Sequence, residues 1–192
     1  MNLRESTGVY ALCFSFCLVF KNGKMEENDK ENINMGASKT NAMRILDNKR
    51  IEYGMMSYDA NDGKIDGITV ADKIGKTPET VFKTLVTHSG PQQLYVFVIP
   101  VATELDLKKA AKAAGAKKIE MLAVKDLQKY TGYIRGGCSP IGMKKQYPTF
   151  IDESATILPE IIVSGGRIGT QIVLKPSEFL EITQAESVAL IK

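Results

Sequence analysis

LYVFVIPV, residues 94–101, is the clearest buried strand in this sequence, and the fold is decided around it. An almost unbroken apolar run of this length is typical of a strand that is covered on both faces. Residues 81–87, VFKTLVT, form a second run of apolar and β-branched residues with the same character. Because both strands look buried on two sides, helices or a second layer of strands must cover them.

The segments around these two strands alternate irregularly between helical and extended patterns. We expect helices at 39–48, 68–74, 105–114 and 124–130, and a last helix that starts at 177–180 with Ser177 as its cap. We expect further strands at 51–58, 118–123 and 150–151, and a hairpin made by 160–163 and 171–174. This irregular order favours a mixed α/β arrangement, of the α+β class, over a regular doubly wound sheet.

Composition sets broad limits on what the chain does. Its 192 residues fit one domain with a sizeable core, and 44% hydrophobic and 24% charged residues are ordinary for a globular protein. A net charge of +3 permits an anionic partner without demanding one. Three cysteines (Cys13, Cys17 and Cys138) and one histidine (His88) make neither a disulfide framework nor a zinc site. We therefore expect reduced thiols and no metal.

The first 34 residues differ from the rest of the chain. Residues 9–20 are apolar but too short to span a bilayer, which takes about 20 residues. Residues 22–34 are polar and charged, which is typical of disorder. We interpret residues 1–34 as an atypical extension and residues 35–192 as the domain. A signal peptide is the alternative, although Glu5 and the lack of a small-residue cleavage site oppose it.

Lys83 is the most informative single position. It lies within a strand pattern, so it shares one face with Val81 and Leu85, while Phe82 and Thr84 lie on the other. Both faces look buried, and an unpaired buried charge is very unfavourable. The ammonium is therefore paired, reaches water at an edge of the sheet, or meets a ligand.

Two glycine-rich segments are candidates for a binding site. In GGCSPIG, residues 136–142, successive amides can form an anion-binding nest or an oxyanion hole; a plain tight turn is the alternative. No histidine lies near Cys138 in sequence to activate it as a nucleophile. SGGRIGT, residues 164–170, lacks the Gly-Lys-Ser/Thr ending of a phosphate loop. It reads as a hairpin turn that is compatible with a wall of the same pocket.

The middle of the chain is rich in lysine. The residues concerned are Lys108, Lys109, Lys112, Lys117, Lys118, Lys125, Lys129, Lys144 and Lys145. They are either solvated helix faces or a surface that contacts phosphates beside the pocket.

The order of these features resembles the YbaK/EbsC family, free-standing relatives of the editing domain of bacterial prolyl-tRNA synthetases. The resemblance covers residue 39 to the end of the chain. It rests on VFKTLV at 81–86, LDLKKAAKAAGAKKIEM at 105–121, TGYIRGGCSPIG at 131–142, FID at 150–152 and VSGGRIG at 163–169. It implies a mixed, barrel-like α/β sheet surrounded by helices. It also implies a cytoplasmic enzyme without cofactor or membrane association that hydrolyses mischarged aminoacyl-tRNA, often Cys-tRNA(Pro).

The resemblance also implies roles for particular residues. Lys83 is expected to meet the terminal adenosine of the tRNA or its phosphate, and Gly136, Gly137 and Ser139 are expected to hold the ester carbonyl. The substrate-binding positions that follow are Tyr58, Thr84, Pro140, Gly142, Asp152, Gly165 and Gly166. The implied partners are the aminoacylated 3′ end of tRNA and prolyl-tRNA synthetase.

The chemistry is consistent with this inventory of residues. An aminoacyl ester is already activated, so positioning and an oxyanion site can supply most of the catalysis, and the thiol of a cysteinyl ester can attack its own carbonyl. The sequence leaves the amino acid and the tRNA open. Two alternatives also remain: a non-catalytic module that binds tRNA or a synthetase, and a small-molecule or nucleotide-binding domain without a tRNA role.

Overall fold

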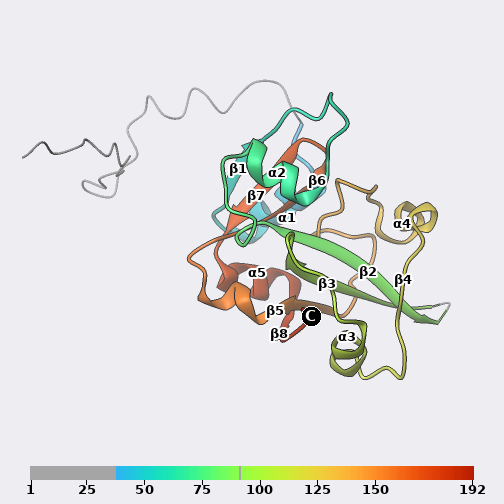
Figure 1. Cartoon of the computed structure of the whole chain (residues 1–192). Helices are drawn as coiled ribbons and strands as arrows, with labels where there is room; N and C mark the ends of the chain where they lie inside the picture. The colour runs from blue at the N-terminus through green and yellow to red at the C-terminus, as the bar shows by residue number, and fades with distance from the viewer. Residues whose placement is uncertain (1–37, 91) are drawn as a thin grey trace, which may run out of the picture. The chain divides into compact units, whose positions relative to one another are not determined.

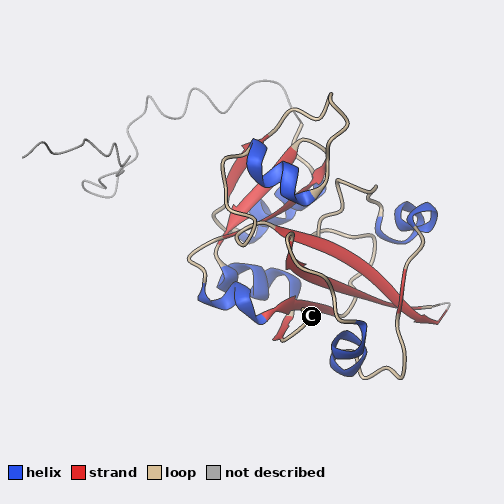
Figure 2. Cartoon of the chain, viewed as in Figure 1, coloured by secondary structure: helices blue, strands red, loops and turns tan. Residues whose placement is uncertain are grey.

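Two β-sheets form the centre of the structure, and five α-helices are distributed around them among the described residues (Figures 1 and 2). This computed structural model describes residues 38–90 and 92–192. The expectations for residues 1–34 lie outside that range. The predicted α+β class, with a mixed sheet and surrounding helices, is confirmed, but the strands divide into two sheets.

The larger sheet has five strands in the order β4-β2-β3-β5-β8. The strands are β2 (Phe82–Gly90), β3 (Gln93–Pro100), β4 (Glu120–Met121), β5 (Thr149–Asp152) and β8 (Glu186–Val188). The predicted central strands pair as an antiparallel hairpin, β2 with β3, in which Lys83 lies opposite Ile99. The pairs β3–β5 and β5–β8 are parallel, which makes the sheet mixed.

The smaller sheet is antiparallel, with the order β1-β7-β6. Its strands are β1 (Gly54–Ser57), β6 (Ile161–Arg167) and β7 (Thr170–Leu174). The predicted hairpin is therefore present, and its register shifts between Ser164 and Arg167 at the two glycines. A single parallel bridge between Val81 and Ile162 connects the two sheets.

The helices are α1 (Asn41–Lys49), α2 (Gly67–Lys73), α3 (Leu107–Ala113), α4 (Val124–Thr131) and α5 (Pro176–Thr183), with a 3-10 helix η3 (Glu153–Ile157). Side-chain caps define three of the starts, since Thr40, Asp66 and Asp106 each accept a hydrogen bond from a first-turn amide. The expected cap of the last helix was wrong. The cap is Lys175, because Pro176 begins the helix, and the carboxylate of Glu178 accepts a hydrogen bond from the Lys175 amide.

The two faces of the β2–β3 hairpin carry different helices. On β3, Val96 and Val98 belong to the core that the apolar side of α4 also joins. Phe97 and Ile99 point to the other side, into the core formed with α3. There the ring of Phe97 stacks on that of Phe150, with centroids 5.2 Å apart. The helices α3 and α4 therefore lie on opposite faces of the hairpin (Figure 1).

Among the residues described, no helix is long and apolar enough to cross a membrane. In the same part of the chain no group of three histidine, cysteine or acidic side chains is placed to hold a metal ion.

Candidate functional site

The ammonium of Lys83 is paired with backbone oxygens. Its Nζ donates to the carbonyl of Val101 at 3.0 Å and to that of Thr103 at 2.6 Å, so it holds the chain where it leaves β3. Burial lowers the pKa of the Lys83 ammonium, and the negative charge of Glu104 opposes that change. The side chain is half-buried. Since an ammonium has three N–H donors, one remains for another acceptor.

The segment Gly136–Gly142 is a folded loop whose central part, residues 137–141, is buried. Gly136 and Gly142 have φ values of +82° and +76°, which favour glycine. The amide of Gly137 donates to the carbonyl of Ile134 at 3.0 Å. The N–H of Gly137 is therefore engaged within the loop in this conformation.

Ser139 and Pro140 also differ from the simplest expectation. Ser139 is fully buried, and its Oγ accepts a hydrogen bond from the amide of Ile141 at 3.2 Å. Pro140 is buried beside it. In this conformation both residues set the shape of the loop instead of presenting a side chain to a ligand.

Cys138 lies in an environment that disfavours its thiolate form. It is buried, and burial raises its pKa to about 12. The thiolate is the nucleophilic form of cysteine, so this environment opposes covalent catalysis at neutral pH.

Tyr133, which no sequence pattern marks as a site residue, organises the loop. Its hydroxyl lies 2.7 Å from the carbonyl oxygen of Ile141 and 3.2 Å from that of Gly142. Asn41 of α1 donates to the same Gly142 carbonyl at 2.8 Å. Burial raises the pKa of Tyr133 to about 12, so the phenol remains a donor at neutral pH. The only local signal was an aromatic residue three positions before the first glycine.

The two glycine-rich segments lie against each other. A methyl group on Gly166, where φ is +92°, would lie 3.0 Å from the Tyr133 ring. A methyl group on Gly137 would lie 3.0 Å from the backbone nitrogen of Ile168. One on Gly165 would meet Thr170 of β7 at the same distance. Glycine at these positions therefore permits close approach of the β6–β7 hairpin to the loop.

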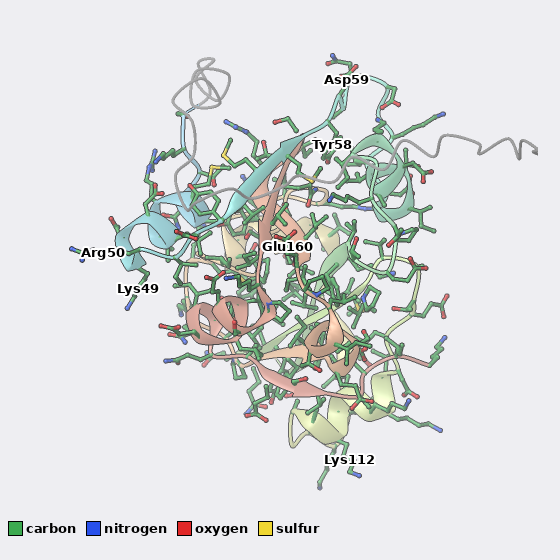
Figure 3. The ribbon with its side chains drawn as sticks, turned by 90° about the vertical axis from the view of Figure 1, so that its left-hand side faces the viewer. Lys49, Arg50, Tyr58, Asp59, Lys112 and Glu160 are labelled. Carbon is green, nitrogen blue, oxygen red and sulfur yellow. The ribbon has the colours of Figure 1, made fainter. Side chains whose placement is uncertain are left out.

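Tyr58 and Thr84 present buried polar atoms without a partner. Tyr58 follows β1, and its amide donates to the carbonyl of Gly169 at 3.0 Å. Among the described residues, neither the Tyr58 hydroxyl nor the Thr84 Oγ1 has a hydrogen-bond partner. Buried polar groups are normally satisfied, so these two atoms, like the equally unpaired Oγ1 of Thr87, are candidates for bonds to water or a ligand. Figure 3 shows Tyr58 where β1 meets the loop that leads to α2.

Asp152 is brought into the interior. It is 1% exposed, and its carboxylate accepts hydrogen bonds from the amide and hydroxyl of Ser154 and from the amide of Leu190. The bond to Leu190, at 2.9 Å, ties the end of β5 to the last residues of the chain. Asp152 is thus placed as a structural clamp, and its expected contact with substrate gains no support from the geometry.

The segment just before α2, residues 65–67, lies between the glycine loop and Val101, the residue to which Lys83 donates. Lys83 and Thr84 lie on opposite faces of β2, and Thr84 is on the side of the loop core. A methyl group on Gly67 would clash with the side chain of Val101, whose backbone carbonyl accepts a hydrogen bond from Lys83. One on Gly136 would lie 2.6 Å from Ile65. Residues 65–67 therefore lie between Val101, to which Lys83 donates, and Gly136 of the loop.

Two surface hollows adjoin the glycine loop and Asp152. One, of about 200 Å³, is lined by Pro140, Gly142 and residues of α5. The other, of about 540 Å³, is lined by Asp152 and the last residues of the chain. Neither is lined by Lys83, Tyr58 or Thr84, so we do not take either as the candidate site.

Residues 68–182 match the aminoacyl-tRNA editing domain, and the chain belongs to this family. The matched range holds Lys83 and both glycine segments. A protein of Enterococcus faecalis named as a proposed Cys-tRNA(Pro)/Cys-tRNA(Cys) deacylase, EbsC, is 47% identical over 148 residues, which is 77% of this chain and 90% of the relative.

Solved structures show the same fold. A crystal structure of a proposed trans-editing enzyme for prolyl-tRNA synthetase superposes with a TM-score of 0.70 at 23% identity, over 81% of this chain and 99% of the other. The hypothetical protein APE2540 superposes with a TM-score of 0.73 at 18% identity, over 80% and 100%. At these identities the likeness concerns the fold alone.

Proposed function

We propose that this protein is a trans-editing deacylase, which hydrolyses the ester between a wrongly attached amino acid and its tRNA. The observation that carries the proposal is the combination of family membership with the arrangement around residues 65–67, which link the loop at Gly136 to Val101, the residue whose carbonyl accepts a hydrogen bond from Lys83. Cys-tRNA(Pro) is the first candidate substrate, because the 47% identical relative bears the name of a deacylase of that species.

Lys83 is the proposed contact for the 3′ end of the tRNA. Two of its N–H groups fix the chain at Val101 and Thr103, which holds the third in a constant direction. A positively charged donor in a half-buried place binds a phosphate or ribose oxygen more strongly than one in open water. This is the proposed reason for a lysine in a strand with two apolar faces.

The glycine loop and the orphaned hydroxyls complete the proposed site. With the amides of Gly137 and Ile141 engaged within the loop, the oxyanion role falls to other amides of Gly136–Gly142. The Tyr58 hydroxyl and Thr84 Oγ1 are the proposed polar contacts for the aminoacyl group or the terminal ribose. Gly165 and Gly166 line the site through the hairpin. No acid–base dyad is needed, because the ester is activated and a cysteinyl thiol can attack its own carbonyl.

The partners and location follow from this activity. We propose the aminoacylated 3′ end of tRNA as substrate and prolyl-tRNA synthetase as the protein that supplies it, with the reaction in the cytoplasm where charged tRNA is found. Hydrophobic pockets separate small amino acids by only about 1–3 kcal/mol, so a second, hydrolytic sieve is the expected solution for mischarged tRNA.

A deacylation panel tests the proposal. Purified protein is incubated with tRNA(Pro) charged with cysteine, alanine or serine, and the release of each amino acid is followed. We expect cysteine to be released fastest, well above spontaneous hydrolysis. If all three esters decay at the spontaneous rate while tRNA still binds, the chain is the non-catalytic binding module instead.

A further inference from the structure

Five exposed basic side chains gather around the glycine loop. Arg135 immediately precedes the loop, and Lys144 and Lys145 follow it after one residue. Lys125 and Lys129 lie on α4. We call these five residues the α4 basic face. They come from three stretches of sequence that meet at the same glycine segment.

A hydrogen bond joins two of these stretches. Nζ of Lys144 lies 3.3 Å from the carbonyl oxygen of Lys129, at the end of α4, to which it donates. A methyl group on Gly132, just past the helix, would lie 3.3 Å from the Lys144 side chain. The end of α4 and Lys144 are therefore neighbours, and Lys145 follows directly in the chain.

Little negative charge offsets this face. Residues 124–146 contain five basic side chains and one acidic one, Asp126, whereas the whole chain carries a net charge of only +3. Among the residues described, the ion pairs involve other lysines: Lys39, Lys73, Lys118 and Lys192. A concentration of positive charge without ionic partners attracts a polyanion and steers its approach.

The face adjoins the proposed position of the ester. In the proposed reaction the aminoacyl ester lies at Gly136–Gly142, so the acceptor strand comes within a few nucleotides of the residues next to this loop. Arg135 is bonded directly to Gly136, and Lys144 is two residues from Gly142. The partner in that position carries one phosphate per nucleotide, and Lys and Arg are the side chains that neutralise phosphates.

We propose that the α4 basic face binds the sugar–phosphate backbone of the tRNA acceptor arm and aligns its 3′ end with the glycine loop. This inference rests on the proposed function, because it takes tRNA as the substrate. The contacts are to phosphates, so they position the RNA without reading its sequence. The face supplies affinity, and Lys83 with the loop supplies the reaction.

Two matched triple variants test the inference. Lys129→Gln/Lys144→Gln/Lys145→Gln removes three charges from the α4 basic face. Lys108→Gln/Lys112→Gln/Lys117→Gln removes three exposed charges from α3 and the residues after it, on the face of the β2–β3 hairpin where Lys83 lies, and so tests the rival lysine surface. Figure 3 shows Lys112 pointing outward, at the opposite end of the described ribbon from Tyr58. Thermal unfolding checks that both variants are folded.

Three measurements are made on each protein: the dissociation constant for uncharged tRNA(Pro) at several salt concentrations, and the hydrolysis of Cys-tRNA(Pro) and of the cysteinyl ester of the trinucleotide CCA. For the α4 variant we expect the dissociation constant and the KM for Cys-tRNA(Pro) to rise at least about 10-fold. Its slope of log affinity against log salt should fall by about 3, one for each lost phosphate contact. Hydrolysis of the short ester should be unchanged. The α3 control should match wild type throughout.

Either of two results overturns the inference: wild-type affinity and salt slope in the α4 variant, or an equal loss in the α3 control. Failure of the proposed function looks different. Wild-type protein would then hydrolyse neither ester, while the binding measurements would still show whether this face holds RNA.

Discussion

The hydroxyl of Tyr133 donates to the carbonyl of Ile141 at 2.7 Å, so a tyrosine that precedes the glycine loop holds the far end of that loop. The ring of the same residue lies against Gly166, in the neighbouring hairpin. Through one side chain, both glycine-rich segments are fixed relative to each other.

Tyr133→Phe therefore separates shape from hydrogen bonding. The ring stays against Gly166, but a buried carbonyl loses its donor, which should lower the free energy of unfolding by about 1–2 kcal/mol. We expect kcat/KM for Cys-tRNA(Pro) to fall about 10-fold under conditions where the variant is fully folded. The measurement is steady-state deacylation alongside denaturant unfolding. Wild-type activity in a destabilised Tyr133→Phe protein would show that loop geometry does not limit the reaction.

Gly137→Ala tests the close approach of the two segments. The new methyl group would lie 3.0 Å from the backbone nitrogen of Ile168, so one segment must move at a cost of about 1–3 kcal/mol. We expect deacylation to fall by more than 10-fold. Gly90→Ala is the matched control, since a methyl group there meets nothing within 4 Å and the backbone is not left-handed. Equal activities of the two variants would contradict the need for close approach.

Asp152→Asn tests whether the carboxylate is a clamp or a substrate ligand. An amide cannot accept at both positions, so a buried donor at Ser154 or Leu190 loses its partner. We expect about 2–3 kcal/mol of destabilisation, with activity per folded molecule within about threefold of wild type. Chemical unfolding and deacylation at low temperature measure the two quantities. A stable protein with a strongly raised KM would restore the substrate-binding role.

The buried Cys138 thiol should make the free energy of unfolding depend on pH in the alkaline range. The thiol ionises near its ordinary pKa of 9.0 in the unfolded chain but at about 12 in the folded protein. Between these values the unfolded state binds fewer protons, so stability is complete below pH 9 and falls as pH rises towards 12. Relative to Cys138→Ala, wild type should lose about 1.4 kcal/mol per pH unit in that window. The check is urea unfolding at several pH values.

The same variant, Cys138→Ala, tests whether the thiol takes part in the reaction. Cys138→Ala should deacylate Cys-tRNA(Pro) within a few-fold of wild type at neutral pH, since the thiol is neutral and buried. A complete loss of activity in a folded Cys138→Ala protein would make the cysteine part of the reaction after all.

Local sequence pattern was enough for the centre of the fold. Residues 81–87 and 94–101 were recognisable as strands because burial on both faces leaves a continuous apolar run. β8 escaped prediction because ESV at 186–188 has almost no apolar signal, and its strand character comes from pairing with β5. β4 is limited to Glu120–Met121, shorter than expected, because only two residues pair with β2.

The site was predictable in outline only. A lysine between apolar residues and two glycine segments carry a signal in their own sequence. The engaged amide of Gly137, the buried hydroxyl of Ser139 and the bond from Tyr133 to Ile141 depend on how the loop folds back on itself. The partner of Asp152, Leu190, lies 38 residues away along the chain, so no local pattern indicates it.

The most direct test of the central claim is deacylation of Cys-tRNA(Pro) by Lys83→Met, which keeps the apolar stem of the side chain and removes the ammonium. Lys76→Met, at an exposed position, is the control. We predict that Lys83→Met remains folded and hydrolyses the ester at least about 100-fold more slowly than wild type, with the control unchanged. A wild-type rate in folded Lys83→Met would contradict the assignment of the site.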